Sequence, residues 1–586
     1  MPIRLKSIKS SSGNTHKLGN FSILVGPNNC GKSQTLRDIR EYVTSGITDR
    51  LKVLNELEIE LPMESQGMKG LRSSPHQSPG HTLISGVSFD LQSRHDFAPS
   101  GNWISQKFNE AKSYPNSNNE LLNNMGKFWV AHLDAESRFR LSSPTDSYDT
   151  RTEAPSNAMQ AFFSEGKEAL NELRTAFREA FGVDIALDWA AMRRFSLRIG
   201  RDFGTIPDTL DGLDHLLKDT PELATQGDGY RSFAGLALAM LTFPDRLLLL
   251  DEPEAFLHPA QARTLGRWLA TYAVKRSSQV ILATHSADFL WGAVSANVNV
   301  SVIRLNRNEN TTQFHAIPPT TITDLAQSPL LSSQPVLDSL FQKGVVVCEG
   351  DPDRAVYQTV AHDRNMVIGG DEILFIHTNG KDAIKAPVKL LRDAGTPACA
   401  IVDIDILNSE QVFAEIVEAL SGEPISKELL NLQNCISKCV DETPQAELLT
   451  TLLQSVTEWQ KVPHNDIRSA RKSLVSVARQ SSKWQIVKKV GANFFKDGNI
   501  AKLEQLIIAC NKLGLFIVPK GELEGWMQLG VTKGRTWNRL ALEKLHEGNC
   551  PPDLKTFVTD IVAFLQPRTS ASCRKHAVTF QESSRS

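Results

Sequence analysis

The sequence lacks the features that would place it in a membrane or outside the cell. No run approaches the ~20 consecutive apolar residues that cross a bilayer. The first residues, MPIRLKSIKSSSG, contain neither an apolar segment nor a signal-peptide cleavage site. Eight cysteines are present, without the spacing of a disulfide framework or a zinc site. We therefore expect a cytoplasmic protein with no membrane partner.

Two cysteines, Cys435 and Cys439, are spaced to share one face of a helix. No further cysteine or histidine lies nearby to complete a metal site. The pattern therefore favours a pair of buried apolar thiols.

The overall charge is close to balanced, at −2, so it gives no sign of a nucleic-acid partner, which would need a local basic patch. Residues 467–496 supply such a patch, because they contain eight basic residues, no acidic residue, Trp484 and two phenylalanines. A DNA-contacting surface and a solvated helix face with core aromatics both fit this pattern. The basic residues are Arg468, Arg471, Lys472, Arg479, Lys483, Lys488, Lys489 and Lys496.

The length of 586 residues exceeds what one hydrophobic core usually serves, which predicts two or three domains. Residues 1–320 alternate strand-like and helical patterns, which favours an α/β fold. We predict strands at 21–25, 246–250, 279–283 and 300–305. A linker at 321–340 separates this part from a second α/β pattern at 341–545, with strands at 344–348, 373–377, 398–402 and 513–518. A helical insert is expected at about 409–510, and a C-terminal helix with a disordered tail at 546–586.

The first motif, GPNNCGKS at 26–33, follows the apolar run FSILV and fits the phosphate-binding pattern G-x-x-x-x-G-K-S. Gly26 and Gly31 allow the backbone to curl so that its amides point at a phosphate. Lys32 would reach the β- and γ-phosphates of ATP, and Ser33 would hold Mg²⁺. Asn29 and Gln34, in and directly after the loop, are further candidate nucleotide-binding residues.

The second half of this nucleotide site is predicted from LLLLDEPE at 247–254. Four apolar residues form a buried strand that delivers Asp251 to the Mg²⁺ water shell. Glu252 is placed to polarise the attacking water. The strand VILATHS ends with His285, which could be a packed histidine, but its position after this motif favours contact with the γ-phosphate.

DEPEAFLHP with a downstream THS resembles the ATP-binding-cassette (ABC) heads of the SMC, Rad50 and RecF type. The resemblance implies heads that work in pairs, with ATP clamped between Gly-Lys-Ser of one copy and a signature loop of the other. The matching segment here is QGDGYRSFAGLALAML, which begins at Gln226. Gly227 stands where a serine is expected, which leaves Gly229 and the helix-terminal amides to contact the γ-phosphate.

A second set of motifs is rich in carboxylates. VVVCEGDPD places Glu349 at the end of a strand and Asp353 in the first turn of the next helix. VDID ends a later strand, and the two-residue period of a strand predicts that Asp403 and Asp405 point the same way.

GELE, after the fourth strand, adds Glu522 and Glu524 to this set. Carboxylates that converge at strand ends repel one another, and hard divalent cations such as Mg²⁺ relieve that repulsion, with Mn²⁺ or Ca²⁺ as alternatives. Phosphoryl chemistry at such a site also needs a basic residue. Lys520 and Lys533 flank GELE and are both candidates. For Lys381 the two interpretations are contact with the DNA backbone and a solvated surface lysine, of which the second is favoured.

The order Glu349, Gly380, then Asp-x-Asp resembles the Toprim domain of topoisomerases, primases and certain nucleases. Asp353 and GELE are similar to the nuclease branch. The chain has only six tyrosines and little room for the separate tyrosine domain of a topoisomerase.

An ABC head followed by Toprim resembles the OLD (overcoming lysogenization defect) nuclease family, which includes the nuclease subunit of Gabija anti-phage systems. The resemblance covers about residues 1–545. It implies cleavage of double-stranded DNA, control by the ATPase, homodimers or larger homo-oligomers built through the heads, and a role in phage defence, with a helicase or another defence subunit as partner. Glu522 stands where some members have a small hydroxyl residue. The metal ligands that the resemblance implies are Glu349, Asp353, Asp403, Asp405 and Glu524.

Three functions are compatible with these motifs. The first is an ATP-regulated, metal-dependent DNA endonuclease. The second is an ATP-driven sensor or clamp whose vestigial Toprim domain controls a partner effector. The third, a repair ATPase of the Rad50 type, is disfavoured because no long heptad repeat is present.

Overall fold

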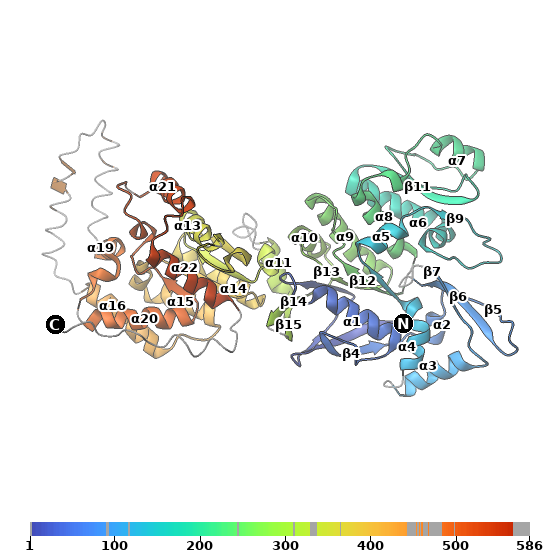
Figure 1. Ribbon diagram of the computed structural model, residues 1–586, viewed down its shortest axis with the longest axis horizontal. Coiled ribbons are helices and arrows are strands. Elements are labelled where there is room, and N and C mark those ends of the chain that lie inside the picture. The colour runs from blue at the N-terminus through green and yellow to red at the C-terminus, as the bar shows by residue number, and fades with distance from the viewer. Residues whose placement is uncertain are drawn as a thin grey trace. The chain divides into compact units, whose positions relative to one another are not determined.

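The computed structural model of the chain divides into two compact units, Met1–Ala326 and Gln327–Ser586. It describes residues 3–88, 93–114, 118–242, 245–308, 311–327, 337–363, 365–441, 483–496, 498–531 and 533–566, with isolated positions between 442 and 482 (Figure 1). The division falls within the segment predicted as a linker. Part of that segment is helix α11 (Pro319–Gln327).

The first unit is built on a six-stranded sheet in which all strands but one run parallel. Its central strands are buried along their whole length, as expected for a sheet with both faces covered. The predicted strands at 21–25 and 279–283 are confirmed, and the one predicted at 246–250 begins one residue later. In spatial order the strands are β15 (Thr311–Ile317), β14 (Val300–Asn308), β3 (Phe21–Val25), β13 (Gln279–Ala283), β12 (Leu247–Asp251) and β8 (Val130–Leu133).

Helices and three smaller sheets complete this unit (Figure 1). The smaller sheets have the orders β2–β1–β4 (Thr15–Lys17, Arg4–Ser10, Leu54–Glu60), β5–β6–β7 (Arg72–Pro75, Thr82–Ser88, Ser93–Phe97) and β10–β11–β9 (Asp184–Asp188, Arg194–Gly200, Thr145–Asp146). The helices are α1 (Lys32–Ser45), α2 (Glu64–Gly67), α3 (Trp103–Ser113), α4 (Asn119–Trp129), α5 (Ala135–Leu141), α6 (Ala158–Phe181), α7 (Leu210–Leu217), α8 (Asp228–Thr242), α9 (Pro259–Lys275) and α10 (Ala287–Val294).

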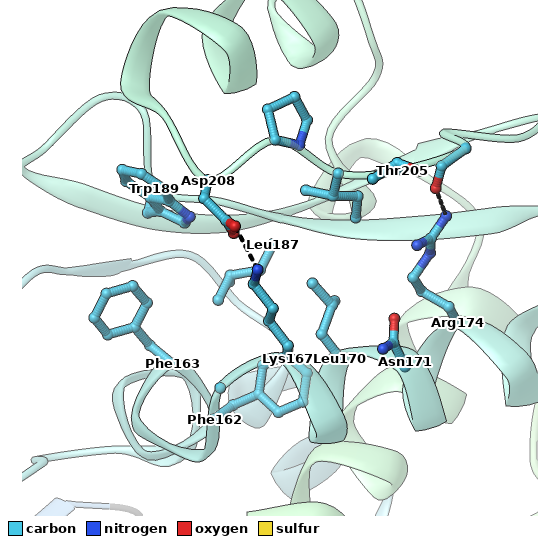
Figure 2. Close-up of a pocket in the computed structure, with 14 residues that line it drawn as sticks. Phe162, Phe163, Lys167, Leu170, Asn171, Arg174, Leu187, Trp189, Thr205 and Asp208 are labelled. Carbon is cyan, nitrogen blue, oxygen red and sulfur yellow. Dashed lines mark hydrogen bonds and ion pairs between the residues drawn. The ribbon is translucent and has the colours of Figure 1, made fainter.

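Helix α6 is interrupted at Gly166, whose φ of 76° and ψ of −154° are accessible mainly to glycine. A cavity of about 370 Å³ lies beside this break (Figure 2). Two polar contacts bridge it: an ion pair between Lys167 and Asp208, and a hydrogen bond from Arg174 to the Gly204 carbonyl. Neither the phosphate-binding loop nor the DEPE segment lines this cavity.

The second unit contains a four-stranded parallel sheet with the order β17–β16–β18–β19. Three of its predicted strands are confirmed, and the fourth is shorter than the predicted 513–518. The strands are β16 (Gly344–Cys348), β17 (Ile373–His377), β18 (Ala398–Val402) and β19 (Leu515–Ile517). The helices are α13 (Asp351–His362), α14 (Lys385–Asp393), α15 (Glu410–Ser421), α16 (Lys427–Asp441), α19 (Lys483–Val490), α20 (Gly498–Lys512), α21 (Arg535–His546) and α22 (Pro552–Leu565).

The described residues between β18 and β19 are mainly helical. Residues 468–470 and 472–482 of the basic segment lie outside the described residues. Helix α22 belongs to the core of the second unit, to which it contributes Leu554, Val558 and Ile561. The tail from 567 onward also lies outside the described residues.

The prediction for Cys435 and Cys439 is wrong. Cys435 is exposed, and Cys439 is only partly buried and accepts a hydrogen bond from the Asn499 side chain at 3.3 Å. The face of α16 that carries these thiols therefore does not point into the apolar core. Among the described residues, no helix combines the length and the apolarity that crossing a membrane requires.

One close approach in the first unit gives a test of the packing. A Cβ atom at Gly126, on α4, would lie 1.9 Å from the carbonyl oxygen of Val43 on α1. We expect Gly126→Ala to destabilise this unit by about 2 kcal/mol, because the two helices would have to separate. Denaturant unfolding measures the loss. Gly227→Ala is the matched control, since nothing lies within 4 Å of its Cβ position, and equal stability of the two variants would contradict this packing.

Candidate functional site

The first site lies at the carboxyl edge of the six-stranded sheet, where the loops after β3, β12 and β13 meet. Gly26 has a φ of 141°, and a Cβ there would lie 2.3 Å from the Leu305 carbonyl oxygen, so the loop requires glycine. Lys32 Nζ donates to the carbonyl oxygens of Gly26 and Pro27 at 2.8 and 2.9 Å. The lysine is thus held inside the curl of the loop.

The loop residues differ in their surroundings. Ser33 Oγ donates to Asp251 Oδ1 at 2.9 Å, which joins the phosphate-binding loop to the end of β12. Gly31 and Asn29 both have positive φ, and Asn29 is exposed. Gln34 donates to Asp38 Oδ1, within its own helix.

The segment after β12 carries the candidate base. Glu252 has a positive φ of 47°, and its Oε1 lies 3.4 Å from His285 Nε2. Burial, assisted by the charge of Lys32, lowers the pKa of His285 to about 4, so its imidazole is neutral at pH 7. A neutral imidazole can donate one hydrogen bond to a phosphate without adding charge.

The neighbouring Glu254 forms hydrogen bonds with residues that follow β13. Its Oε1 accepts from Thr284 Oγ1 at 2.7 Å and from the His285 amide at 3.0 Å, and burial raises its pKa. These bonds tie the segment after β12 to the end of β13. The segment predicted as a signature runs into α8, with Gly229 in the first turn of the helix and packed near the Phe256 carbonyl oxygen.

The second site lies at the carboxyl edge of the four-stranded sheet. Glu349 follows β16, and its Oε1 accepts from the Asp403 amide at 2.8 Å. Ligand oxygens of Glu349, Asp403 and Asp405 all lie within 4.8 Å of one another. The structure therefore brings together three of the carboxylates that the sequence singles out.

The prediction that strand alternation makes Asp403 and Asp405 point the same way is wrong. Strand β18 ends at Val402, and Asp403 caps a 3₁₀ helix at Ile404–Asn408. Asp403 and Asp405 therefore come together on a tight turn and not by strand alternation. Sequence periodicity does not reveal a turn that begins within the motif.

The carboxylates are strained electrostatically. Burial, with repulsion from Asp403, raises the pKa of Glu349 to about 8 and that of Asp353 to about 7. Burial also raises the pKa of Asp403. Glu349 and Asp353 thus lose ionisation near neutral pH unless a cation is nearby.

Several lysines reach this acidic cluster. Lys488 Nζ lies 2.7 Å from Asp403 Oδ2 and 3.4 Å from Asp405 Oδ1. Lys533 Nζ lies 2.7 Å from Glu522 Oε2 and 3.5 Å from Glu524 Oε2.

Two lysines lie elsewhere than the sequence predicts. Lys381 Nζ contacts Asp405 Oδ2 at 3.1 Å, so it is not the solvated surface lysine expected above. Lys520 Nζ lies 2.7 Å from Asp553 Oδ2 on α22.

The sequence does not single out Lys488 as a residue of the acidic site. It belongs to the basic segment that suggests a DNA surface, and only folding shows that it faces the carboxylates. Its helix, α19, and the turn after it pack against the loop at 519–521: a Cβ at Gly521 would lie 2.0 Å from the Lys488 carbonyl oxygen, and the Ala492 amide donates to the Pro519 carbonyl oxygen. Although burial alone lowers the pKa of Lys488, Asp403 and Asp405 raise it overall.

The donor set fits a hard divalent cation. Asp405 Oδ1 and Glu524 Oε2 are buried and have no hydrogen-bond partner among the described residues. The contacts of these two atoms with lysines, at 3.4 and 3.5 Å, are long for a hydrogen bond. Buried carboxylate oxygens of this kind are the ligands that Mg²⁺, Mn²⁺ and Ca²⁺ take.

Comparison with known families assigns both parts of the chain. Residues 21–290 match a family of AAA domains described with the AbiEii toxin of type IV toxin–antitoxin systems. Residues 340–405 match the Toprim domain of proteins like the overcoming lysogenization defect protein. This pair of domains matches an ATPase–Toprim protein of the OLD family. The chain thus has an ATPase domain followed by a Toprim domain, and its fold is α/β as predicted.

Several solved structures are similar to part of this chain. An Smc head bound to the C-winged helix domain of ScpA is 14% identical, covers 54% of this chain and 96% of its own, and has a TM-score of 0.33. An Smc head of Pyrococcus furiosus is 9% identical, with 55% of this chain and 98% of that chain covered and a TM-score of 0.30. The SMC head of Thermotoga maritima is 12% identical, with 54% of this chain and 98% of that chain covered and a TM-score of 0.28. The curated proteins contain no match to the chain.

The raised pKa of Glu349 gives a testable pH dependence. Since its pKa in the folded state lies above that of an unfolded glutamate, its contribution to stability is full at low pH and is lost as pH rises through about 8. We expect Glu349→Gln to gain at least about 3 °C in Tm relative to wild type between pH 6 and pH 9 in a chelating buffer. Differential scanning calorimetry measures this gain. Glu428→Gln, at an exposed position on α16, is the control, and a Tm difference that is constant with pH would contradict the assignment.

Proposed function

We propose that this OLD-family chain is an ATP-regulated, divalent-metal-dependent DNA endonuclease. The observation that carries the proposal is the group formed by Glu349, Asp403 and Asp405, of which Asp403 is buried and the other two are partly buried. Burying carboxylates against one another is costly unless a cation compensates them. Metal-dependent enzymes use such an arrangement to hold their ions.

The residues of the Toprim site have separable roles in this proposal. Two bound Mg²⁺ or Mn²⁺ ions would activate water and stabilise the leaving oxygen in phosphodiester cleavage. The acidic residues hold these ions, with Asp353 and Glu524 beside the central group. Lys488 and Lys533 carry positive charge toward the carboxylates, so either can stabilise a phosphate that gains charge.

The ATPase site supports nucleotide binding and hydrolysis. Lys32 and Ser33 would bind the phosphates and Mg²⁺, together with Asp251. Glu252 acts as the base that orients the attacking water, and the neutral His285 contacts the γ-phosphate. The bond between Ser33 and Asp251 supports this reading, because it joins two groups that would share one ion.

The substrate and partners follow from the family. We propose double-stranded DNA as the substrate, pairing of the chain through its ATPase domain, and a function in anti-phage defence, with a helicase or another defence subunit as partner. Similarity to the nuclease subunit of Gabija systems is part of this proposal.

The alternative, an ATP-driven clamp with a vestigial Toprim domain, predicts erosion of the carboxylate set. Glu349, Asp353, Asp403, Asp405 and Glu524 are instead all present, and the central three converge. This favours the enzyme. Absence of cleavage on any DNA, together with intact ATP hydrolysis and a stable partner complex, would favour the clamp.

Plasmid cleavage tests the proposal directly. We expect the wild-type protein to nick or cut supercoiled plasmid with Mg²⁺ or Mn²⁺, and Glu349→Ala to lose at least about 10³-fold in rate while it binds ATP normally, because it removes a metal ligand. Full activity of Glu349→Ala would overturn the proposal. The same assay with ATP, ADP or no nucleotide, run beside Lys32→Ala, gives the direction of control by ATP.

The lysines near the carboxylates can be ranked in the same assay. We expect Lys488→Met to lower the cleavage rate by about 10²-fold, because Lys488 is the described lysine that contacts both Asp403 and Asp405. Lys520→Met should change the rate by less than about threefold, since its ammonium pairs with Asp553. The reverse order would show that Lys520 reorients toward the substrate.

A further inference from the structure

Arg138 lies where three parts of the ATPase domain meet. It belongs to α5, and it is fully buried. Its Nε donates to Ser232 Oγ at 2.9 Å, its Nη1 to the Asp251 carbonyl oxygen at 2.8 Å, and its Nη2 to the Glu252 carbonyl oxygen at 3.1 Å. The planar guanidinium fixes the angles between these bonds, so the three acceptors are held in one geometry.

The bond to Glu252 acts on a backbone that needs support. A positive φ is uncommon for a residue with a side chain. The Glu252 amide donates to the Ala283 carbonyl oxygen at 2.9 Å, and its carbonyl oxygen accepts from Arg138 and from the Ala255 amide. Since φ and ψ set the direction in which a side chain leaves the backbone, these bonds determine where the Glu252 carboxylate lies.

The bond to Ser232 acts on the signature helix. Ser232 lies one turn after Gly229 on α8. A Cβ at Gly235, further along α8, would lie 1.9 Å from the Arg138 carbonyl oxygen, so α8 and α5 are packed backbone to backbone. A displacement of α8 is therefore passed to α5 and to the guanidinium.

We propose that Arg138 is a positioning residue that couples the start of α8 to the carboxylate of Glu252. Its three donor nitrogens are engaged by protein acceptors, so it acts on ATP hydrolysis through Glu252 and not by contact with the nucleotide. Contact between a nucleotide and the start of α8 then sets the hydrolysis rate. This inference rests on the role proposed above for Glu252.

The test uses Arg138→Lys, which keeps the buried charge but cannot donate in three fixed directions. We expect kcat for ATP hydrolysis to fall by about 10²-fold, because a small displacement of the base is enough. KM and the affinity for a fluorescent ATP analogue should change by less than about threefold, since Lys32 and Ser33 are untouched. Arg140→Lys, on the same helix but exposed and paired with Glu136, is the control and should keep wild-type kcat.

A second background separates positioning from a general structural defect. In Glu252→Gln, which already lacks the base, adding Arg138→Lys should change the residual rate by less than about twofold. An equal loss in both backgrounds, or an unchanged kcat in Arg138→Lys alone, would overturn the inference.

A third variant tests the link to α8. Ser232→Ala removes only that bond, and we expect it to lower kcat by about fivefold. An unchanged kcat in Ser232→Ala would overturn the coupling to α8. Normal hydrolysis by Glu252→Gln alone would instead refute the role proposed for Glu252, an outcome distinct from failure of the inference about Arg138.

Discussion

Both candidate sites depend on one constraint, the parallel pairing of short buried strands. Parallel strands present their carboxyl ends at the same edge of a sheet, so residues far apart in the sequence meet there. In the first unit this edge brings Ser33 to Asp251, which are 218 positions apart. In the second it brings Glu349 to the amide of Asp403. The apolar runs that form the strands therefore determine where the polar chemistry lies.

At the carboxyl edge of the four-stranded sheet, repulsion between the carboxylates destabilises the fold that brings them together. Burial holds the pKa of Glu349 and Asp353 far above that of a free carboxyl group. Lysines from three elements offset part of this cost, and Lys488 does so from the helical insert. Since an ammonium group is a single point charge with three donors, it cannot satisfy every carboxylate oxygen. Asp405 Oδ1 and Glu524 Oε2 are left without a hydrogen-bond partner among the described residues. A divalent ion is the group that would bind such oxygens.

The sequence predicts the strands and motifs well, because the length of the apolar runs, about five residues, suits a buried strand and is too short for a buried helix. The strands β3, β13, β16, β17 and β18 lie where they were predicted. It predicts less well what depends on local turns and on long-range packing. Asp403 and Asp405 converge through a 3₁₀ turn, Lys488 faces inward from a segment that reads as a surface, and the thiol of Cys435 is exposed. Arg138 belongs to none of the sequence motifs.

The glycine at position 227 makes the packing around α8 more important. A signature serine would contact the γ-phosphate directly, and its hydroxyl would report the nucleotide by itself. In the proposed arrangement Gly227 supplies no hydroxyl, so the nucleotide would contact Gly229 and the backbone amides at the start of α8, which move as a unit with the helix. Information about the nucleotide then travels as a displacement of α8. Arg138 is the described side chain that bonds both to this helix and to the backbone of Glu252, so the proposed coupling depends on this one guanidinium.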